Sequence, residues 1–136
     1  MCDMSESPVQ RVLVVEDNPV LRRHLFSLLD QEGIACILVK NEDEALEQDF
    51  RGVNAVVADI DLSEAGGDLQ GGILMVKGLA EREIHIPIIL ISCTPPVNVD
   101  GSYGSIKESQ VFAILDRNNP FFRKDLMRCL HEVLEG

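Results

Sequence analysis

Five short runs of apolar residues, rich in Val and Ile, alternate along the chain with segments in which apolar residues recur at helical spacing. Because the runs are apolar almost throughout, they predict strands that are buried on both faces of a sheet. The predicted strands comprise residues 12–15, 34–39, 53–58, 87–91 and 111–115. Strands of this kind are typical of a parallel sheet that is covered by helices.

Helix-start signals precede the two segments that follow the first two strands. Asn18 before Pro19 predicts the start of a helix, and Gly33 predicts its end. Asn41 with Glu44 three residues later forms a capping pair, which predicts a short helix to about Phe50.

Two further helices are predicted in the second half of the chain. One extends from Ile73 to near Arg82, and the other begins at Asn119 and Pro120. The apolar face of the last helix comprises Phe122, Leu126, Leu130, Val133 and Leu134. One of the adjacent residues Phe121 and Phe122 faces the core, and the other marks a contact surface, so homodimerisation through this region is a hypothesis.

The remaining segments have weak patterns. Residues 60–72 predict a loop, because they carry four of the ten glycines of the chain. Residues 97–110 show little periodicity and predict at most a short or irregular helix. Residues 1–10 predict a loose leader, so a single domain spans residues 11–136.

The order of elements predicts the fold class. Strands that alternate with helices indicate an α/β protein with a doubly wound, five-stranded parallel sheet and helices on both faces. In sheets of this class, binding sites lie at the carboxyl ends of the strands.

Composition narrows the classes of partner. The 136 residues carry a net charge of −11, which disfavours direct binding to nucleic acid or to a membrane surface. No apolar run is long enough to span a bilayer, and the first residues lack the basic and apolar regions of a signal peptide. These features predict a cytoplasmic protein.

Acidic side chains follow two of the predicted strands. Glu16 and Asp17 follow the first strand, and Asp59 and Asp61 follow the third. A hydroxyl, that of Ser92, follows the fourth strand. If these strands are neighbours, the carboxylates converge, and clustered carboxylates are retained mainly where a cation neutralises them. An oxygen-only ligand set favours Mg²⁺ or Mn²⁺.

Three motifs carry a resemblance to a known family. Val12-Leu13-Val14-Val15-Glu16-Asp17-Asn18, Asn54-Ala55-Val56-Val57-Ala58-Asp59-Ile60-Asp61-Leu62 and Pro87-Ile88-Ile89-Leu90-Ile91-Ser92 occur in this order. In this order and spacing the chain resembles the receiver domain of bacterial two-component response regulators, over roughly residues 11–135. The resemblance implies a flavodoxin-like fold.

The resemblance also implies roles for individual residues. Asp59 accepts a phosphoryl group from a sensor histidine kinase or a histidine phosphotransfer protein. The metal is held by Asp17, by Asp59, by Glu16 directly or through water, and by the backbone carbonyl of Asp61. The hydroxyl of Ser92 donates a hydrogen bond to a phosphoryl oxygen and acts as the switch. The chain is then a signalling domain and not an enzyme, beyond its own phosphorylation and dephosphorylation.

Three departures from the family pattern bear on function. The family lysine after the fifth strand aligns with Asp116, and Arg117 takes its place only if the strand slips by one residue. The aromatic switch position aligns with Ala113, and the adjacent Phe112 should point the other way. The loop that follows Asp59, residues 62–72, is long and lacks proline.

Several functions remain open at this level. The first is a stand-alone receiver whose output, to an unidentified protein, is protein–protein contact. The second is a degenerate receiver that binds partners without phosphorylation, which Asp116 motivates. The third is a metal-dependent phosphoryl-transfer enzyme, because Asp59-Ile60-Asp61 also resembles the nucleophile motif of haloacid-dehalogenase-type phosphatases. Glu16 with a later Asp-x-Asp also resembles toprim enzymes.

Overall fold

The computed structural model describes residues 10–59, 71–92 and 111–135. Its centre is a five-stranded sheet in the order β2-β1-β3-β4-β5, and every pair of neighbouring strands is parallel. The strands are β1 (Arg11–Val15), β2 (Ala35–Val39), β3 (Ala55–Asp59), β4 (Ile88–Ser92) and β5 (Val111–Asp116). The helices are α1 (Pro19–Gln31), α2 (Glu42–Leu46), α3 (Gly71–Glu81) and α4 (Phe122–Glu135), with a 3₁₀ helix at Phe50–Gly52. The predicted α/β class is confirmed.

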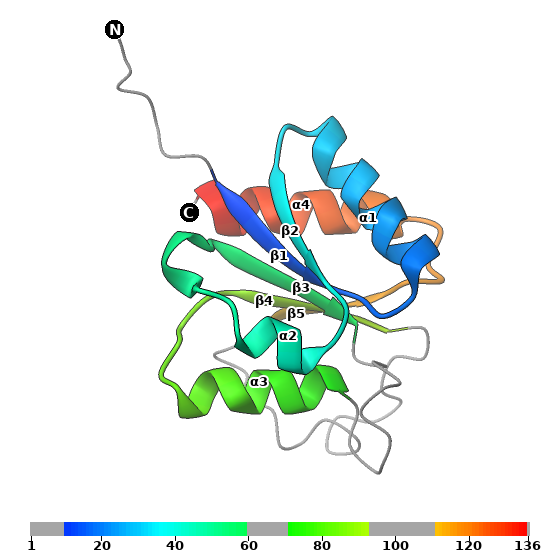
Figure 1. The fold of residues 1–136 in the computed structure, drawn as a ribbon. Coiled ribbons are helices and arrows are strands. Elements are labelled where there is room, and N and C mark those ends of the chain that lie inside the picture. Colours follow the sequence, from blue (N-terminus) through cyan, green and yellow to red (C-terminus); the bar gives the residue numbers. More distant parts are fainter. Residues whose placement is uncertain (1–9, 60–70, 93–110, 136) are drawn as a thin grey trace, which may run out of the picture.

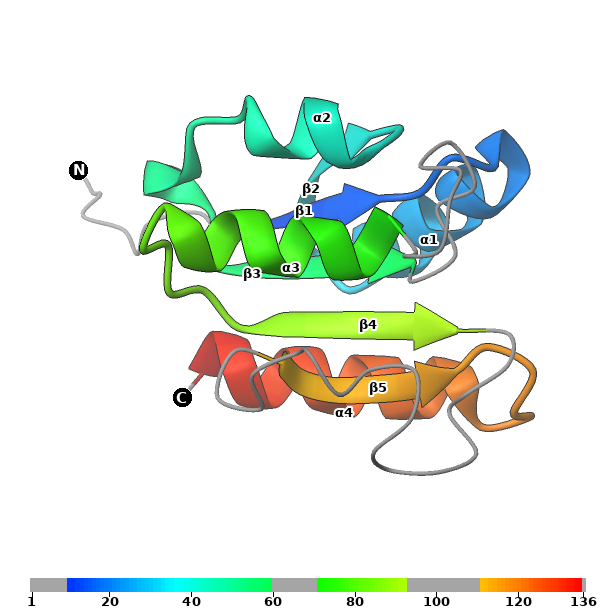
Figure 2. The same cartoon turned by 90° about the horizontal axis from the view of Figure 1, so that it is seen from below.

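Helices cover both faces of the sheet (Figures 1 and 2). Helices α1 and α4 pack on one face, and α2 and α3 pack on the other. Successive strand residues supply the two cores in turn, so Val12 and Val14 pack toward α1 and α4 while Leu13 and Val15 pack toward α2 and α3. Burial on both faces explains why the strands are apolar throughout.

The predicted start of α1 is confirmed in atomic detail. The side-chain Oδ1 of Asn18 accepts hydrogen bonds from the backbone N–H groups of Val20 at 2.9 Å and Leu21 at 3.2 Å. At the other end, Gly33 has a φ angle of 75°, a conformation that a residue with a Cβ rarely adopts. The first helix is therefore defined by its two ends.

Helix α2 is shorter than predicted. The capping residues act as expected, because Asn41 Oδ1 accepts from the N–H of Glu44 at 2.9 Å. The prediction of a helix to about Phe50 was wrong, since α2 ends at Leu46. The carboxylate of Asp49 accepts a hydrogen bond from the N–H of Arg51 and caps a separate 3₁₀ helix. The side chain therefore favours a new turn over continuation of α2.

Helix α3 is longer at its start than predicted. The loop was expected to extend to Gly72, whereas α3 begins at Gly71. A glycine disfavours a helix by only about 1 kcal/mol, and burial of Met75, Val76 and Leu79 exceeds that penalty. The rest of the glycine-rich loop, residues 60–70, and the weakly patterned segment 97–110 lie outside the described residues.

Helix α4 begins later than predicted. Asn119 and Pro120 were expected to open the helix, whereas α4 starts at Phe122. The side chain of Asn119 accepts from the N–H of Phe121 at 2.7 Å and closes a turn ahead of the helix. Phe122 is buried and Phe121 is exposed. This agrees with the prediction that only one of the two residues faces the core.

Strand β5 contains an irregularity that shifts the register of its later residues by one position. Ile88 pairs with Val111, but Ile89 pairs with Ala113, so Phe112 is an extra residue on the β5 side. Beyond this bulge the pairing is regular, and Ser92 lies opposite Asp116.

None of the helices within the described ranges has both the length and the apolar composition needed to cross a membrane.

Candidate functional site

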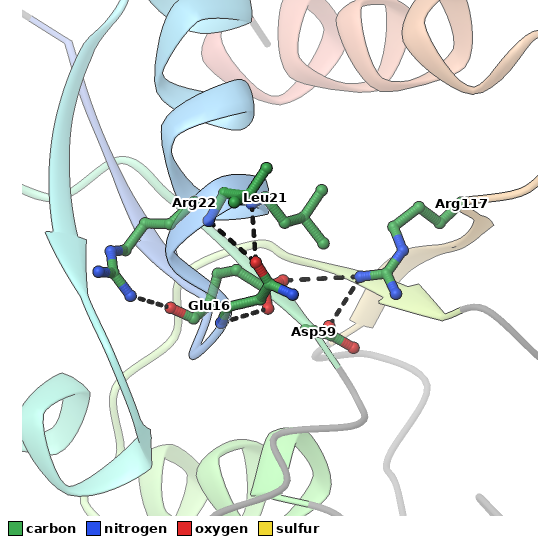
Figure 3. Close-up of polar contacts among 7 residues, drawn as sticks. Glu16, Leu21, Arg22, Asp59 and Arg117 are labelled. Carbon is green, nitrogen blue, oxygen red and sulfur yellow. Dashed lines mark hydrogen bonds and ion pairs between the residues drawn. The ribbon is translucent and has the colours of Figure 1, made fainter.

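The first side chain of the site follows β1. Glu16 is only 1% exposed, and its Oε2 accepts from the backbone N–H of Asn18 at 3.1 Å. Its backbone N–H donates to the carbonyl of Val39 at 3.1 Å, and its own carbonyl accepts from Arg22 Nη1 at 2.8 Å (Figure 3). These contacts tie the position of Glu16 to β2 and to the first turn of α1.

Strand β3, the neighbour of β1, supplies the carboxylate of Asp59. Asp59 is the last residue of β3 and is 4% exposed. Since β3 pairs with β1, Asp59 lies beside the residues that follow Val15. One carboxylate oxygen each from Glu16, Asp17 and Asp59 lies within 4.8 Å of the others. We call these three residues the acidic cluster, and the predicted convergence of their carboxylates is present.

Burial makes the cluster electrostatically unfavourable without a cation. Desolvation by burial, together with the neighbouring carboxyls of Asp59 and Asp17, raises the pKa of Glu16 from 4.5 to about 8, although the hydrogen bond from the N–H of Asn18 lowers it. The Oε1 atom of Glu16 is buried and accepts no hydrogen bond from any of the described residues. A buried oxygen without a donor, among two other carboxylates, fits the ligand set of a hard divalent cation.

A positive side chain reaches the cluster from the turn that follows β5. Arg117 Nη1 lies 3.0 Å from Asp59 Oδ2 and 3.8 Å from Glu16 Oε1. Dashed lines in Figure 3 mark both contacts. Its side chain is 25% exposed, so the guanidinium is placed at the rim of the cluster. Such a cation attracts anionic groups to the site and offsets the repulsion among the carboxylates.

The structure decides between the two residues that compete for this position. Asp116 Oδ1 accepts from the N–H of Asn118 at 2.9 Å, and its carbonyl accepts from the N–H of Asn119 at 3.1 Å, so Asp116 closes the turn after β5. Arg117, not Asp116, forms the ion pairs with the acidic cluster. Of the two residues that the sequence offered for the lysine position, Arg117 is therefore the one whose side chain contacts the acidic cluster.

Ala113 was the residue aligned with the aromatic position of the family. The corresponding position counted back from Arg117 is Ile114, which is 37% exposed and is not aromatic. Ala113 packs against the core under α1 and α4. Phe112 is 46% exposed, so it points away from that core, as expected of a residue next to Ala113.

The predicted hydroxyl lies at the same edge of the sheet. Ser92 is the last residue of β4 and is fully buried. Its strand pairs with β3 so that Ile91 lies opposite Asp59, and its carbonyl accepts from the N–H of Arg117 at 2.9 Å. Ser92 therefore lies between the strand ends that carry Asp59 and Arg117. Asp61 lies outside the described residues.

Sequence analysis missed one supporting residue. Arg22 anchors the carbonyl of Glu16 from the first turn of α1. The available signal was an arginine six residues after Glu16, in the first turn of a helix that begins at Pro19. From this position a long side chain can reach back to the carbonyl of Glu16.

The sequence matches one family model and is similar to a curated protein. The family model for the response regulator receiver domain matches residues 12–99. The transcriptional regulatory protein PhoP of Escherichia coli (strain K12) is 29% identical over 82 residues, which cover 60% of this chain. The matched segment spans only 35% of PhoP, so PhoP is a much longer protein.

Solved structures share the fold. A response regulator receiver protein from Pseudoalteromonas atlantica has a TM-score of 0.77 at 14% identity, covering 93% of this chain and 98% of that one. The response regulator TrrA from Thermotoga maritima, in complex with Mg²⁺-BeF, has a TM-score of 0.71 at 22% identity, covering 91% and 98%. The receiver domain of a sensor histidine kinase from Pseudomonas aeruginosa PAO1, with a magnesium ion coordinated in the active site cleft, has a TM-score of 0.73 at 22% identity, covering 93% and 98%.

Proposed function

Because the chain belongs to the response regulator receiver domain family, we propose that it is a signalling module that accepts a phosphoryl group on Asp59. The observation that carries this proposal is the buried acidic cluster with Asp59 in contact with the guanidinium of Arg117. A carboxylate at a strand end, beside a cation and a hydroxyl-bearing neighbour, has the parts needed for phosphoryl transfer.

The proposed reaction is a transfer between two proteins. An oxygen of the Asp59 carboxylate attacks phosphorus in the phosphohistidine of a sensor kinase or a histidine phosphotransfer protein. A P–O bond to Asp59 forms as the P–N bond breaks, and the donor imidazole leaves with the electron pair of that bond. The product is an acyl phosphate on Asp59, and it returns to the carboxylate by hydrolysis.

A divalent cation fits the acidic cluster. Asp17 and Asp59 are the proposed direct ligands, with Glu16 binding directly or through water and Asp61 offering its backbone carbonyl. Magnesium, when bound, supplies positive charge that lowers the repulsion between the carboxylate and the incoming phosphoryl group. The magnesium ions of the Thermotoga and Pseudomonas relatives support this choice over other metals.

Two further residues of this chain serve the transferred group. Arg117 is proposed to contact a phosphoryl oxygen in place of the family lysine, because it already pairs with Asp59. The hydroxyl of Ser92 is proposed to donate to a second phosphoryl oxygen. Since Ile114 is not aromatic, movement of Ser92 is coupled to the surface of β5 differently from the usual pattern.

The proposed partners follow from this chemistry. The chain acts in the cytoplasm, its donor is a sensor histidine kinase or a histidine phosphotransfer protein, and its output is contact with another protein. The net charge of −11 disfavours nucleic acid as a direct partner of this domain. Pairing of two copies through the region of α4 is a secondary proposal, which the exposed Phe121 supports.

Intact-protein mass spectrometry tests the proposed function. The protein is incubated with Mg²⁺ and acetyl phosphate, or with a phosphorylated histidine phosphotransfer protein. We expect the mass of one phosphoryl group to be added, and Asp59→Asn to abolish the addition. Asp116→Asn is the matched control. Asp116 lies at the same edge of the sheet as Asp59, but its carboxylate accepts a hydrogen bond from the N–H of Asn118 in the following turn. That variant should still be phosphorylated.

The other outcomes separate the alternatives. Bound magnesium without an adduct on Asp59 would favour a binding module that works without phosphorylation. Multiple-turnover hydrolysis of phosphate esters would indicate a metal-dependent phosphatase or a toprim-like enzyme. Either result contradicts the proposal.

A further inference from the structure

We propose that a pocket between α1 and β2 binds an extended segment of a partner protein, with a carboxylate of that segment paired with Arg22 and Arg23. The pocket has a volume of about 230 Å³ and is lined by Pro19, Arg22, Arg23, Phe26 and Leu38. We call it the α1–β2 pocket. The proposal concerns the unphosphorylated chain, so it does not depend on the proposed phosphoryl transfer.

The charge of the lining favours an anionic ligand. The lining contains two arginines and no acidic residue, although the chain has a net charge of −11. Neither Arg22 nor Arg23 forms an ion pair with any of the described residues. Arg22 Nη1 donates to the carbonyl of Glu16 at 2.8 Å (Figure 3), which leaves the other N–H groups of this guanidinium for a further acceptor. A carboxylate is an acceptor of matching charge and geometry.

The rest of the lining is apolar. Pro19, Phe26 and Leu38 complete the pocket, and Phe26 and Leu38 are 39% and 40% exposed. Apolar surface of this kind gains free energy when another apolar group covers it. The ligand is therefore expected to carry an apolar side chain beside its carboxylate.

The open edge of β2 favours a protein segment over a small molecule. Among the described residues β2 pairs with β1 alone, so β2 is an edge strand. The carbonyl of Val39 accepts from the N–H of Glu16 and so faces β1, which turns the N–H and carbonyl of Leu38 away from the sheet. The strand contains neither a charged residue nor a proline, the usual protection of an edge. An extended segment can pair with this edge while its side chains enter the pocket.

The place of the pocket in the fold separates it from the acidic cluster. Asp59 ends β3, and β1 lies between β3 and β2 in the sheet. A segment added outside β2 does not occupy the strand end that carries Asp59. The surface is therefore distinct from the one that a phosphoryl donor has to reach.

Titration of the ¹⁵N-labelled native chain with a peptide, followed by NMR, tests the proposal. The probe is acetyl-Thr-Glu-Thr-Phe-Thr-amide, whose glutamate and phenylalanine lie on one face of a strand. We expect the amide signals of Phe26 and Leu38 and the Nε–H signals of Arg22 and Arg23 to shift together. The same peptide with glutamine in place of glutamate should bind more weakly.

Arg23→Gln should weaken peptide binding about three-fold, the order expected for the loss of one exposed ion pair. Arg51→Gln is the matched control, because Arg51 is 90% exposed and lies in the 3₁₀ helix ahead of β3, outside the pocket lining. This variant should bind the peptide as the native chain does. Equal binding by Arg23→Gln and the native chain overturns the pairing with a carboxylate.

Backbone methylation tests the pairing with β2. Two further peptides carry N-methyl groups, one on the threonine nitrogens and one on the glutamate and phenylalanine nitrogens. Because alternate residues of a strand face its neighbour, only one of the two should lose binding. Equal binding by both, or binding of 3-phenylpropionate as tight as that of the parent peptide, would indicate a site for small carboxylates and overturns the proposal. No titration requires a phosphoryl group on Asp59, so these outcomes leave the proposed function unaffected.

Discussion

Single residues at the acidic cluster show how burial changes ordinary chemistry. Glu16 is nearly inaccessible, and its pKa of about 8 means that it carries a proton at neutral pH without a cation. Arg117, which follows β5 at the same edge of the sheet, offsets the charge of the Asp59 carboxylate. In the absence of a metal ion, one protonated acid and one basic side chain thus reduce the negative charge of the site.

The raised pKa of Glu16 predicts a pH dependence of stability for the metal-free protein. Between pH 4.5 and about 8, the folded state keeps the Glu16 proton and the unfolded chain loses it. The contribution of Glu16 to the free energy of unfolding should therefore be highest below this range and fall as pH rises, by roughly a few kcal/mol in total. Urea denaturation in the presence of a chelator, at several pH values, measures this slope.

Glu16→Gln is the matching variant, because it keeps an acceptor for the N–H of Asn18 and removes the titration. The slope between pH 4.5 and about 8 should flatten in the variant. A slope that is unchanged in Glu16→Gln would show that another group is responsible.

At the scale of elements, the ends of helices and strands position the site. The cap of α1 fixes the chain directly after Glu16 and Asp17, since Asn18 bonds both to the helix and to the Glu16 carboxylate. The bulge at Phe112 and the turn that Asp116 closes bring Arg117 to the cluster. The bulge and the turn therefore determine that Arg117, and not Asp116, contacts the acidic cluster.

The cap of α1 predicts a defined loss of stability. Asn18→Ala removes the acceptor for two N–H groups of the first turn and should lower the free energy of unfolding by about 1 kcal/mol. Equilibrium denaturation measures the change. Asn18→Ser, which keeps a side-chain oxygen at the cap, should recover most of the loss, and failure to recover it would mean that the cap is not the cause.

At the scale of the molecule, one sheet supports two cores. Ile89 and Leu90 are adjacent in β4 and fully buried, yet Ile89 packs toward α1 and α4 while Leu90 packs toward α2 and α3. Because all five strands share the backbone ladder, the two cores depend on one sheet.

The shared sheet predicts that both cores unfold together. Ile89→Ala and Leu90→Ala should each cost about 2–5 kcal/mol, although they empty opposite faces. Far-UV and near-UV thermal transitions should remain coincident in both variants. Leu38→Ala is the control, because Leu38 is 40% exposed on the edge strand and should cost about 1 kcal/mol or less. Separate transitions for the two faces would contradict this view.

The sequence by itself determined the class of the fold and the acidic part of the site. Apolar strands and helical periodicity depend on burial, and burial is written in the order of residue types. The cap at Asn18 and the stop at Gly33 depend on neighbours in the chain, so they were also predictable. Glu16, Asp17 and Asp59 followed from the rule that parallel strands end at one edge.

Only the tertiary structure decided the features that depend on pairing between distant segments. The bulge at Phe112 arises between β4 and β5, and no local pattern indicates it. The choice of Arg117 over Asp116 is of the same kind, because a one-residue difference in register reverses which side chain faces the carboxylates.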